Sequence, residues 1–169
     1  LTEVVLPDSL TEIGENVFNS CYNLTSVTLP ANLTSLGVSA FQYCWNLSAD
    51  TNAYTLYYNG YYLGSATNPY LAFIDVADTS ALSSSSITVH EDTKIVGSYA
   101  FDNCRNYEVY LSNSLVFFGR YAFYAGGLYI HYDGTIAEWN EISKMDYMFL
   151  GMGADSYSIM CTDGSPEHD

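Results

Sequence analysis

The chain has 169 residues, 49% of them hydrophobic, and 19 acidic against 4 basic residues give it a formal net charge of −15. Its length and hydrophobic content suffice for one domain with a substantial core and exclude a wholly disordered protein. The shortage of Lys and Arg excludes nucleic acid and anionic membrane surfaces as partners, because both are bound through basic side chains. The excess of acid serves solubility or, alternatively, steers a cationic partner.

A repeated pattern runs through much of the chain. Residues 1–23, LTEVVLPDSLTEIGENVFNSCYN, align without gaps on residues 24–46, LTSVTLPANLTSLGVSAFQYCWN. A third copy covers about residues 84–106 and a fourth about residues 106–127. The shared pattern is V-x-L-P-x-x-L-x-x-I-G-x-x-A-F-x-x-C-x-x-L. Because one such unit cannot bury its own apolar face, the repetition predicts copies that stack into a solenoid.

Each copy predicts the same succession of short elements. The alternation in V-x-L, as at Val4 and Leu6, indicates a strand that is buried on one face. The glycines of the pattern suit tight corners, where a side chain or ordinary backbone angles would not fit. They are Gly14, Gly37, Gly97 and Gly119. The Phe is expected to anchor a short helical turn, with the Cys three residues later on the same face. The predicted structural core therefore includes Phe18, Phe41, Phe101, Phe123, Cys21, Cys44 and Cys104.

Three of the four cysteines share one column of the repeat, whereas a reactive nucleophile is normally unique. Stacked copies would place Cys21 and Cys44 about 5 Å apart, within the range that a disulfide tolerates. Stacked side chains point in parallel, however, which favours free thiols buried as small hydrophobes. Cys161 stands outside the pattern and is left unassigned.

Residues 47–83 interrupt the pattern with a tyrosine-rich insert. Asn59-Gly60, between β-favouring residues, is a strong signal for a hairpin. The Asn-Pro-Tyr of residues 68–70 predicts a turn, and LAFIDV after it predicts a third strand. We therefore expect a small antiparallel β-meander joined to the edge of the solenoid. A loop over residues 78–86 would then return the chain to the stack.

Residues 128–169 are expected to form a terminal strand and a cap. The sequence LYIHYDGTIAEWNEI begins as a fifth strand and becomes helical, and its Trp139 and Ile142 would cover the open apolar edge. SYSIMCTDG, residues 156–164, predicts a last strand and turn. Because the chain opens inside a repeat without a comparable cap, we expect the native protein to continue upstream.

The repeated pattern resembles the BspA-like, or Treponema-type, leucine-rich repeats of bacterial surface proteins. The resemblance covers residues 1–46 and about 84–142. It implies a curved solenoid with parallel strands on one side and short helices or turns elsewhere. It also implies an extracellular or cell-surface setting, and several members of such families are linked to adhesion.

The expected fold class is thus an α/β repeat, a leucine-rich-repeat solenoid with stacked parallel strands and short helices, an inserted antiparallel β-meander and a C-terminal cap. The whole chain, residues 1–169, is expected to form a single domain. Its parts are repeats 1 and 2 (1–46), the insert (47–83), repeats 3 and 4 (84–127) and the terminal strand and cap (128–169).

The residue types that carry out catalysis or bind metals form no recognisable motif. His90, His131 and His168 lack metal-ligand spacing, and neither H-E-x-x-H nor C-x-x-C occurs. The acidic residues follow no EF-hand pattern, and the glycines form no phosphate-binding loop ahead of a helix. No signal-peptide pattern and no apolar run of membrane-spanning length is present. We therefore expect no enzyme, no cofactor, no metal and no membrane insertion.

Tyrosine, with 17 residues, dominates the candidate binding surface. Tyrosine is favoured at interfaces because it offers a large, rigid contact with a polar tip. The candidate partner-binding residues are Tyr110, Tyr129 and His131 on the strand face and Tyr57, Tyr61 and Tyr70 in the insert. The insert tyrosines are alternatively explained by packing against the solenoid. We expect a non-catalytic extracellular or cell-surface recognition or adhesion module for a protein partner; the alternatives are a glycan-binding module and a passive structural spacer.

Overall fold

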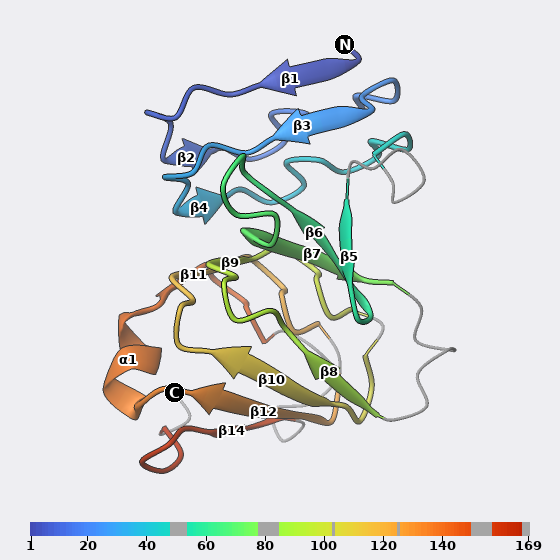
Figure 1. The fold of residues 1–169 in the computed structure, drawn as a ribbon. Helices are drawn as coiled ribbons and strands as arrows, with labels where there is room; N and C mark the ends of the chain where they lie inside the picture. The colour runs from blue at the N-terminus through green and yellow to red at the C-terminus, as the bar shows by residue number, and fades with distance from the viewer. Residues whose placement is uncertain (48–53, 78–84, 103, 125, 150–156, 167–169) are drawn as a thin grey trace.

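A computed structural model describes residues 1–47, 54–77, 85–102, 104–124, 126–149 and 157–166 (Figure 1). The chain winds as a β-solenoid, and we call each turn of the solenoid a coil. The strands are β1 (Glu3–Val5), β2 (Glu12–Ile13), β3 (Ser26–Thr28), β4 (Ser35–Leu36), β5 (Thr55–Tyr57), β6 (Gly60–Leu63), β7 (Ala72–Val76), β8 (Ser86–Thr88), β9 (Ile95–Val96), β10 (Glu108–Ser112), β11 (Phe117–Phe118), β12 (Leu128–Asp133), β13 (Ser143–Lys144) and β14 (Tyr157–Met160). The described residues contain a single helix, α1 (Ile136–Glu141).

The V-x-L part of the repeat forms the parallel strands that the sequence predicts. We call the coils that contain β8, β10, β12 and β14 the C-terminal coils. These four strands make a parallel sheet in the order β14-β12-β10-β8. In the N-terminal coils, residues 1–47, β1 pairs with β3 in the same parallel way. Side chains alternate across the sheet, so that Val109 is buried while its neighbours Glu108 and Tyr110 are exposed. The exposed side chains of this sheet form the strand face.

The insert folds as the expected antiparallel meander, in which β6 pairs with both β5 and β7. Strand β7 also pairs in parallel with β9, so the meander extends the second sheet of the solenoid, in the order β13-β11-β9-β7-β6-β5. The loop expected at residues 78–86 lies, apart from its last two residues, outside the described part of the chain.

The turn of the β5–β6 hairpin lies one residue earlier than the Asn-Gly signal indicates. Tyr58 and Asn59 form the turn, with Tyr58 at a φ of 48°, and Gly60 already pairs with Tyr57 in the ladder. Gly60 is required for another reason, because a Cβ atom there would lie 2.5 Å from Cε2 of Phe73. The glycine therefore lets a core ring pack against the hairpin.

The repeated Phe residues lie in isolated turns rather than in helices, with the Cys N–H donating to the Phe carbonyl oxygen, as from Cys21 to Phe18 at 3.2 Å. The residue two before each Phe has a positive φ, as at Asn16 (58°) and Tyr99 (61°), which breaks a right-handed helix. The backbone N–H groups instead donate to the neighbouring coil, as from Phe18 to Ala40 O and from Phe101 to Ala122 O, both at 2.9 Å. The described repeats contain strands and turns but no helix, so the expectation of short helices within them is not confirmed.

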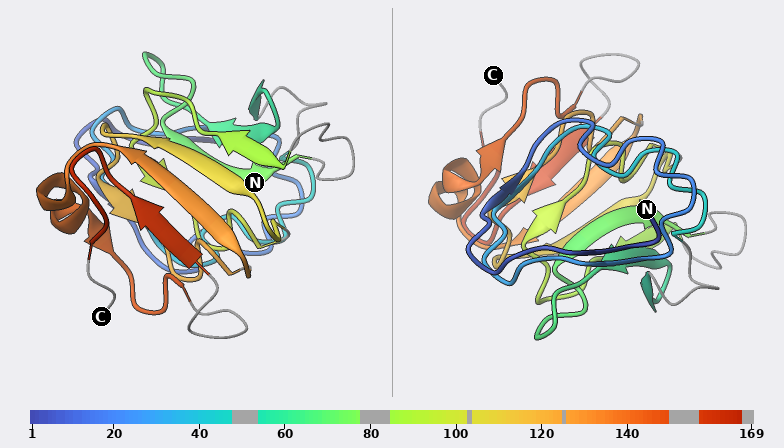
Figure 2. Two further views of the ribbon diagram at one scale, coloured as in Figure 1. Left: turned by 90° about the horizontal axis from the view of Figure 1, so that it is seen from below. Right: turned by 90° about the horizontal axis from the view of Figure 1, so that it is seen from above.

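Helix α1 forms where the sequence predicts it, but its role as a cap is not confirmed. A reciprocal capping box between Thr135 and Glu138 begins the helix, and Trp139 is buried on its inner face. The Trp139 ring contacts Phe118 and Tyr132, each with a centroid distance of 5.3 Å. Seen from below in Figure 2, α1 lies beside the stack, and β14 is the outermost strand.

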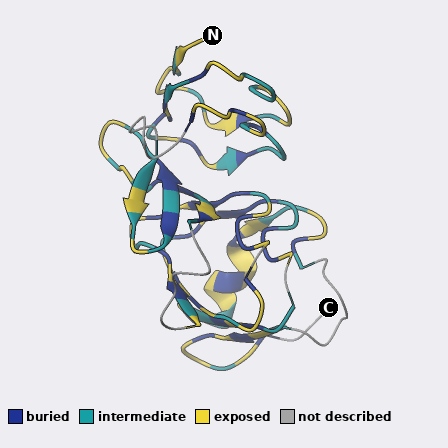
Figure 3. Cartoon of the chain, turned by 90° about the vertical axis from the view of Figure 1, so that its right-hand side faces the viewer, coloured by how far each residue is buried: buried dark blue, intermediate teal, exposed yellow. Residues whose placement is uncertain are grey.

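Two hydrophobic cores lie on opposite faces of β9 and β11. Val96 and Phe118 belong to the core of the C-terminal coils, whereas Ile95 and Phe117 pack with Ile13 and Leu36 of the N-terminal coils. Both strands are consequently buried on both faces, in contrast to β2 and β4. The N-terminal coils thus pack against the second sheet, above the C-terminal coils in Figure 3.

The phenylalanines of the repeat form stacked columns. Phe101 lies between Phe73 of the insert and Phe123, with centroid distances of 4.8 and 5.1 Å. Phe18 and Phe41 stack at 5.2 Å in the N-terminal coils. Phe101 and Phe123 are buried, whereas Phe18 and Phe41 are half-buried. The insert therefore supplies a ring to the phenylalanine column of the C-terminal coils.

The four cysteines are free. Cys44 and Cys104 are buried, whereas Cys21, which was expected to be buried with them, is half-buried. Cys44 Sγ lies 3.1 Å from the carbonyl oxygen of Phe18 in the preceding coil. Burial raises the pKa of Cys104 to about 12, which keeps this thiol protonated and unreactive at neutral pH.

Asp75 on β7 makes the stability of the fold depend on pH. Burial raises the pKa of its carboxyl to about 6, although the Val76 N–H donates a 2.7 Å hydrogen bond to Oδ1 that lowers it. Because the unfolded value is near 3.9, the folded protein binds the proton more tightly. The stabilisation is fully present below about pH 4 and is lost as the pH rises towards about 6.

We therefore expect Asp75→Asn to stabilise the protein at about pH 7.5 and to have little effect at about pH 4. Burial of the carboxyl is only partial, because the residue as a whole is exposed and water screens its charge. The gain at neutral pH should therefore be no more than about 1 kcal/mol, or about 2–4 °C in Tm. Thermal unfolding of both proteins at the two pH values measures it. An equal gain in Tm at both pH values would show that the raised pKa of Asp75 is not the cause.

Candidate functional site

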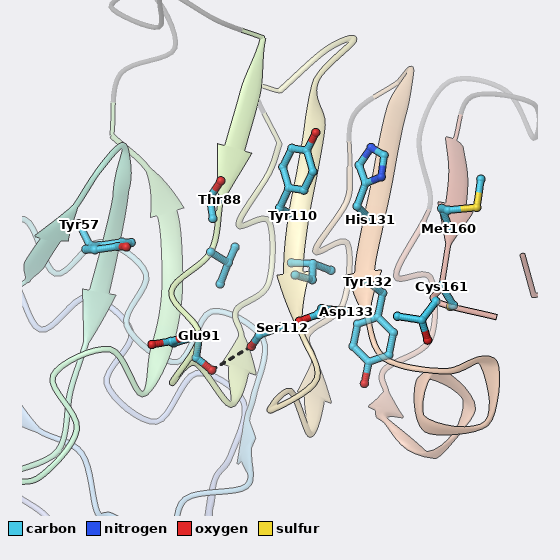
Figure 4. A pocket seen from close by; sticks show the side chains of 13 residues that line it. Tyr57, Thr88, Glu91, Tyr110, Ser112, His131, Tyr132, Asp133, Met160 and Cys161 are labelled. Carbon is cyan, nitrogen blue, oxygen red and sulfur yellow. Dashed lines mark hydrogen bonds between the residues drawn. The ribbon is translucent and has the colours of Figure 1, made fainter. Parts of the chain in front are cut away.

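The strand face of the C-terminal coils is hollowed into a groove with a volume of about 590 Å³, which we call the strand-face groove (Figure 4). Thr88, Tyr110, His131 and Met160 follow one another across it, one on each strand of the sheet. Tyr57 of the insert lies at the opposite side of the groove from Met160. The groove is therefore built jointly by the repeats and the insert.

The row forms because parallel strands align equivalent positions of successive coils. Tyr110 is opposite Thr88 on one side and His131 on the other, and His131 is opposite Met160. The rings of Tyr110 and His131 stack with a centroid distance of 4.6 Å and an interplanar angle of 9°. Each ring thus holds the other in place, and one face of each is covered.

Glu108 orients this aromatic pair from the neighbouring row. Tyr110 donates a hydrogen bond of 2.5 Å from its hydroxyl to Glu108 Oε2, and His131 Nε2 lies 4.0 Å from the same oxygen. The hydrogen bond to the carboxylate raises the pKa of Tyr110, and burial adds to the shift. The two rings are consequently fixed before any partner binds.

Carboxylates line the side of the groove towards the ends of the strands. Glu91 and Asp133 are exposed, and both border the groove. Ser112 lies between them and donates a 2.9 Å hydrogen bond from Oγ to the Glu91 carbonyl oxygen (Figure 4). Among the described residues that border the groove, none is lysine or arginine.

Tyr57 is held in position by a cluster of aromatic rings behind it. Its ring contacts His90 at 4.6 Å and Tyr70 at 5.3 Å, and His90 stacks on Tyr70 at 3.7 Å. Tyr62, which is fully buried, accepts a 3.0 Å hydrogen bond at its hydroxyl from the His90 N–H. This side of the groove is therefore anchored in the core.

The structure brings together three of the six candidate residues: Tyr57, Tyr110 and His131 line the groove. Tyr129 is exposed on β12 but pairs with Glu108, one row away from the groove. Tyr61 contacts Tyr54 within the insert, and Tyr70 supports Tyr57 from behind. The contacts of Tyr61 and Tyr70 agree with the alternative explanation, in which the insert tyrosines serve packing.

Glu91, Asp133 and Met160 also line the groove, although none of them was predicted from the sequence. The period of two along a strand could have revealed Asp133, which follows His131 on the same face. The same rule identifies Ser112 after Tyr110. Glu91 lies in the turn after β8, where no periodicity applies, so its place at the groove depends on the fold.

No group of three or more His, Cys, Asp or Glu side chains among the described residues is arranged to hold a metal ion. In the same part of the chain, no helix has the length and hydrophobicity needed to span a membrane. His168 lies outside the described residues.

A comparison with protein-family models matches the chain to the BspA type leucine rich repeat region, in six copies over residues 1–65 and 78–132. The chain belongs to the BspA-type leucine-rich repeat family. The match confirms the resemblance seen in the repeated pattern. The match counts six copies where the repeated pattern shows four, and it covers residues 47–65 and 78–83 of the insert.

Among solved structures, a leucine-rich cell surface protein from Faecalibacterium prausnitzii A2-165 is similar to this BspA-type chain, with 21% sequence identity and a TM-score of 0.43. The similarity covers 80% of this chain and 42% of that protein, so the chain spans less than half of the other protein's length. No curated protein matches the chain.

Proposed function

We propose that this BspA-type repeat domain is a non-catalytic recognition module of an extracellular or cell-surface protein, and that it binds a protein partner in the strand-face groove. The observation that carries the proposal is the convergence of Tyr57, Tyr110 and His131 on one groove. These residues come from the insert and from two successive coils. Family membership supports the surface setting.

The groove has the properties of a protein-binding site. Its aromatic side chains are held by stacking and by the hydrogen bond to Glu108, so little side-chain entropy is lost on binding. Aromatic residues surrounded by polar groups are typical of the residues that contribute most binding energy at interfaces. Tyr110 remains 39% exposed, which leaves it accessible to a partner.

A glycan-binding site is less well supported by the same geometry. Sugars stack on rows of open aromatic faces, whereas the row across the strands carries rings only at Tyr110 and His131, with Thr88 and Met160 at its other positions. A passive spacer, the other alternative, requires no groove with prearranged aromatic side chains. The protein partner is therefore the function that the groove supports best.

The test compares Tyr110→Ala/His131→Ala with the unchanged protein against immobilised extracellular-matrix proteins and a glycan array. We expect binding to at least one matrix protein, weakened about tenfold or more in the double variant because two central aromatic contacts are lost. Tyr129→Ala is the matched control. It removes an exposed ring from β12, the strand of His131, one row outside the groove.

The remaining outcomes contradict the proposal in different ways. Matrix binding that the double variant retains would exclude the groove as the site. Binding restricted to the glycan array would favour the glycan alternative. Absence of binding to every probe would favour the spacer. Circular dichroism of all variants ensures that a loss of binding is not a loss of fold.

A further inference from the structure

We propose that the strand-face groove takes an extended, cationic segment of its protein partner, with lysine or arginine side chains at Glu91 and Asp133. This inference rests on the function proposed above and specifies the chemistry of the partner. It follows from the charge, the shape and the aromatic surface of the groove.

The groove carries carboxylates without a lysine or arginine beside them. Glu91 and Asp133 border it, and none of the described bordering residues is lysine or arginine. Glu108, in the next row, lies near His131 and accepts the hydrogen bond from Tyr110. The chain as a whole carries only 4 basic residues against 19 acidic ones. A hollow lined by one sign of charge concentrates the field and attracts the opposite charge. A cationic partner would therefore be both steered to the groove and held there.

Lysine and arginine are the side chains that the bordering groups can pair with. Both carboxylates are exposed, so each can accept hydrogen bonds from an ammonium or guanidinium group without first breaking a buried contact. Binding at an exposed carboxylate retains solvation and avoids the large penalty of burying an unpaired charge.

The dimensions of the groove suit an extended segment. It runs across the four strands β8, β10, β12 and β14, which at about 4.8 Å between neighbours corresponds to about 15 Å. An extended chain rises about 3.3 Å per residue, so about four or five residues fill this length. Glu91 follows β8 and Asp133 ends β12, two strand spacings away. Two basic residues within one short segment can therefore reach both carboxylates.

The aromatic row contributes a second attraction for cations. Tyr110 has His131 on one side but the small Thr88 on the other, so within the described part of the chain no ring covers its second face. A guanidinium or ammonium group near an open tyrosine face gains a cation–π interaction. Met160 at the end of the row is flexible and 55% exposed, which lets the groove adapt to different side chains.

The experiment uses a fluorescein-labelled octapeptide of alternating lysine and serine, with matched peptides that carry glutamine or glutamate in place of lysine. Fluorescence polarisation measures their binding to the protein at low salt and at about 0.5 M NaCl, where exposed charge pairs are screened. We expect the lysine peptide to bind at low salt, the glutamine peptide at least about tenfold more weakly, and the glutamate peptide not at all.

Two charge variants show whether the attraction comes from the groove. Glu91→Gln/Asp133→Asn is expected to weaken binding of the lysine peptide about fivefold, because both proposed contacts lose their charge. Glu3→Gln/Glu12→Gln removes the same amount of charge from exposed positions of the N-terminal coils and should leave binding nearly unchanged. Equal weakening by the two variants would mean that net charge, not the groove, attracts the peptide, and would overturn the inference.

Two further results overturn it in distinguishable ways. Equal binding of the glutamine and lysine peptides would show that charge does not select the segment. A matrix protein whose binding depends on Tyr110 and His131, without any binding of the lysine peptide, would refute the cationic chemistry and leave the proposed function intact. If Tyr110→Ala/His131→Ala still bound both the matrix protein and the lysine peptide, the proposed function and this inference would both be refuted.

Discussion

Phe101→Ala is expected to lower the free energy of unfolding by about 3–5 kcal/mol, as is usual for a fully buried phenylalanine. Phe101 has 0% exposure and stacks between Phe73 at 4.8 Å and Phe123 at 5.1 Å. Truncation would leave a cavity between two rings that the backbone hydrogen bonds between coils hold apart. Urea unfolding followed by circular dichroism measures the change.

Phe41→Ala provides the matched control, since Phe41 occupies the same position of the repeat in the N-terminal coils. It is only half-buried, and among the described residues it stacks on Phe18 alone, at 5.2 Å. We expect it to cost about 1–2 kcal/mol, because less apolar surface is buried and the site can collapse. A larger loss for Phe41→Ala than for Phe101→Ala would contradict the assignment of Phe101 to the centre of the core.

The repeat pattern predicts the strands well because their cause is local. Alternation in V-x-L determines which side chains face the core, and stacking of equivalent positions determines the parallel register. The short helices are not confirmed within the repeats, because i, i+3 spacing of Phe and Cys fits a helix and also fits an isolated turn that contains a residue with positive φ. The sequence did not indicate a positive φ at Tyr99 and Tyr121, since tyrosine rarely adopts a positive φ.

The second core was present in the sequence but was not recognised. Ile95-Val96 and Phe117-Phe118 replace Glu12-Ile13 and Ser35-Leu36 at equivalent positions of the repeat. Two consecutive apolar residues in a short strand indicate burial on both faces. Which segment covers the outer face is a long-range property, and a repeat pattern based on neighbouring coils contains no information about it.

The candidate site was predictable only in part. Tyr110 and His131 occupy adjacent coils at the same position, so their proximity follows from the repeat register. Tyr57 reaches the same groove because the insert folds back beside β9, which no periodicity in the sequence indicates. The packing of Tyr70 against His90 likewise depends on that fold, so sequence alone could not separate supporting tyrosines from exposed ones.

Gly119→Ala is expected to destabilise the protein by about 3 kcal/mol, at the upper end of what overpacking usually costs. The glycine has no positive φ, so the reason for it is space. A Cβ atom at this position would lie 2.6 Å from the backbone nitrogen of Ser98 and 2.9 Å from the carbonyl carbon of Gly97 in the preceding coil. Backbone atoms of a hydrogen-bonded coil cannot move aside as the end of a side chain can, so the two coils would have to separate.

Two other glycines of the column, Gly97 and Gly14, form a graded series with Gly119 for the same measurement. At Gly97 the nearest atom to an added Cβ is Phe73 O at 3.2 Å, and at Gly14 it is Val17 Cγ2 at 3.5 Å. Gly97→Ala should therefore cost less than Gly119→Ala. Gly14→Ala should be neutral or stabilise by up to about 1 kcal/mol, because alanine reduces the entropy of the unfolded chain. Equal losses at all three positions would show that backbone conformation, rather than the close approach of successive coils, requires glycine at this corner.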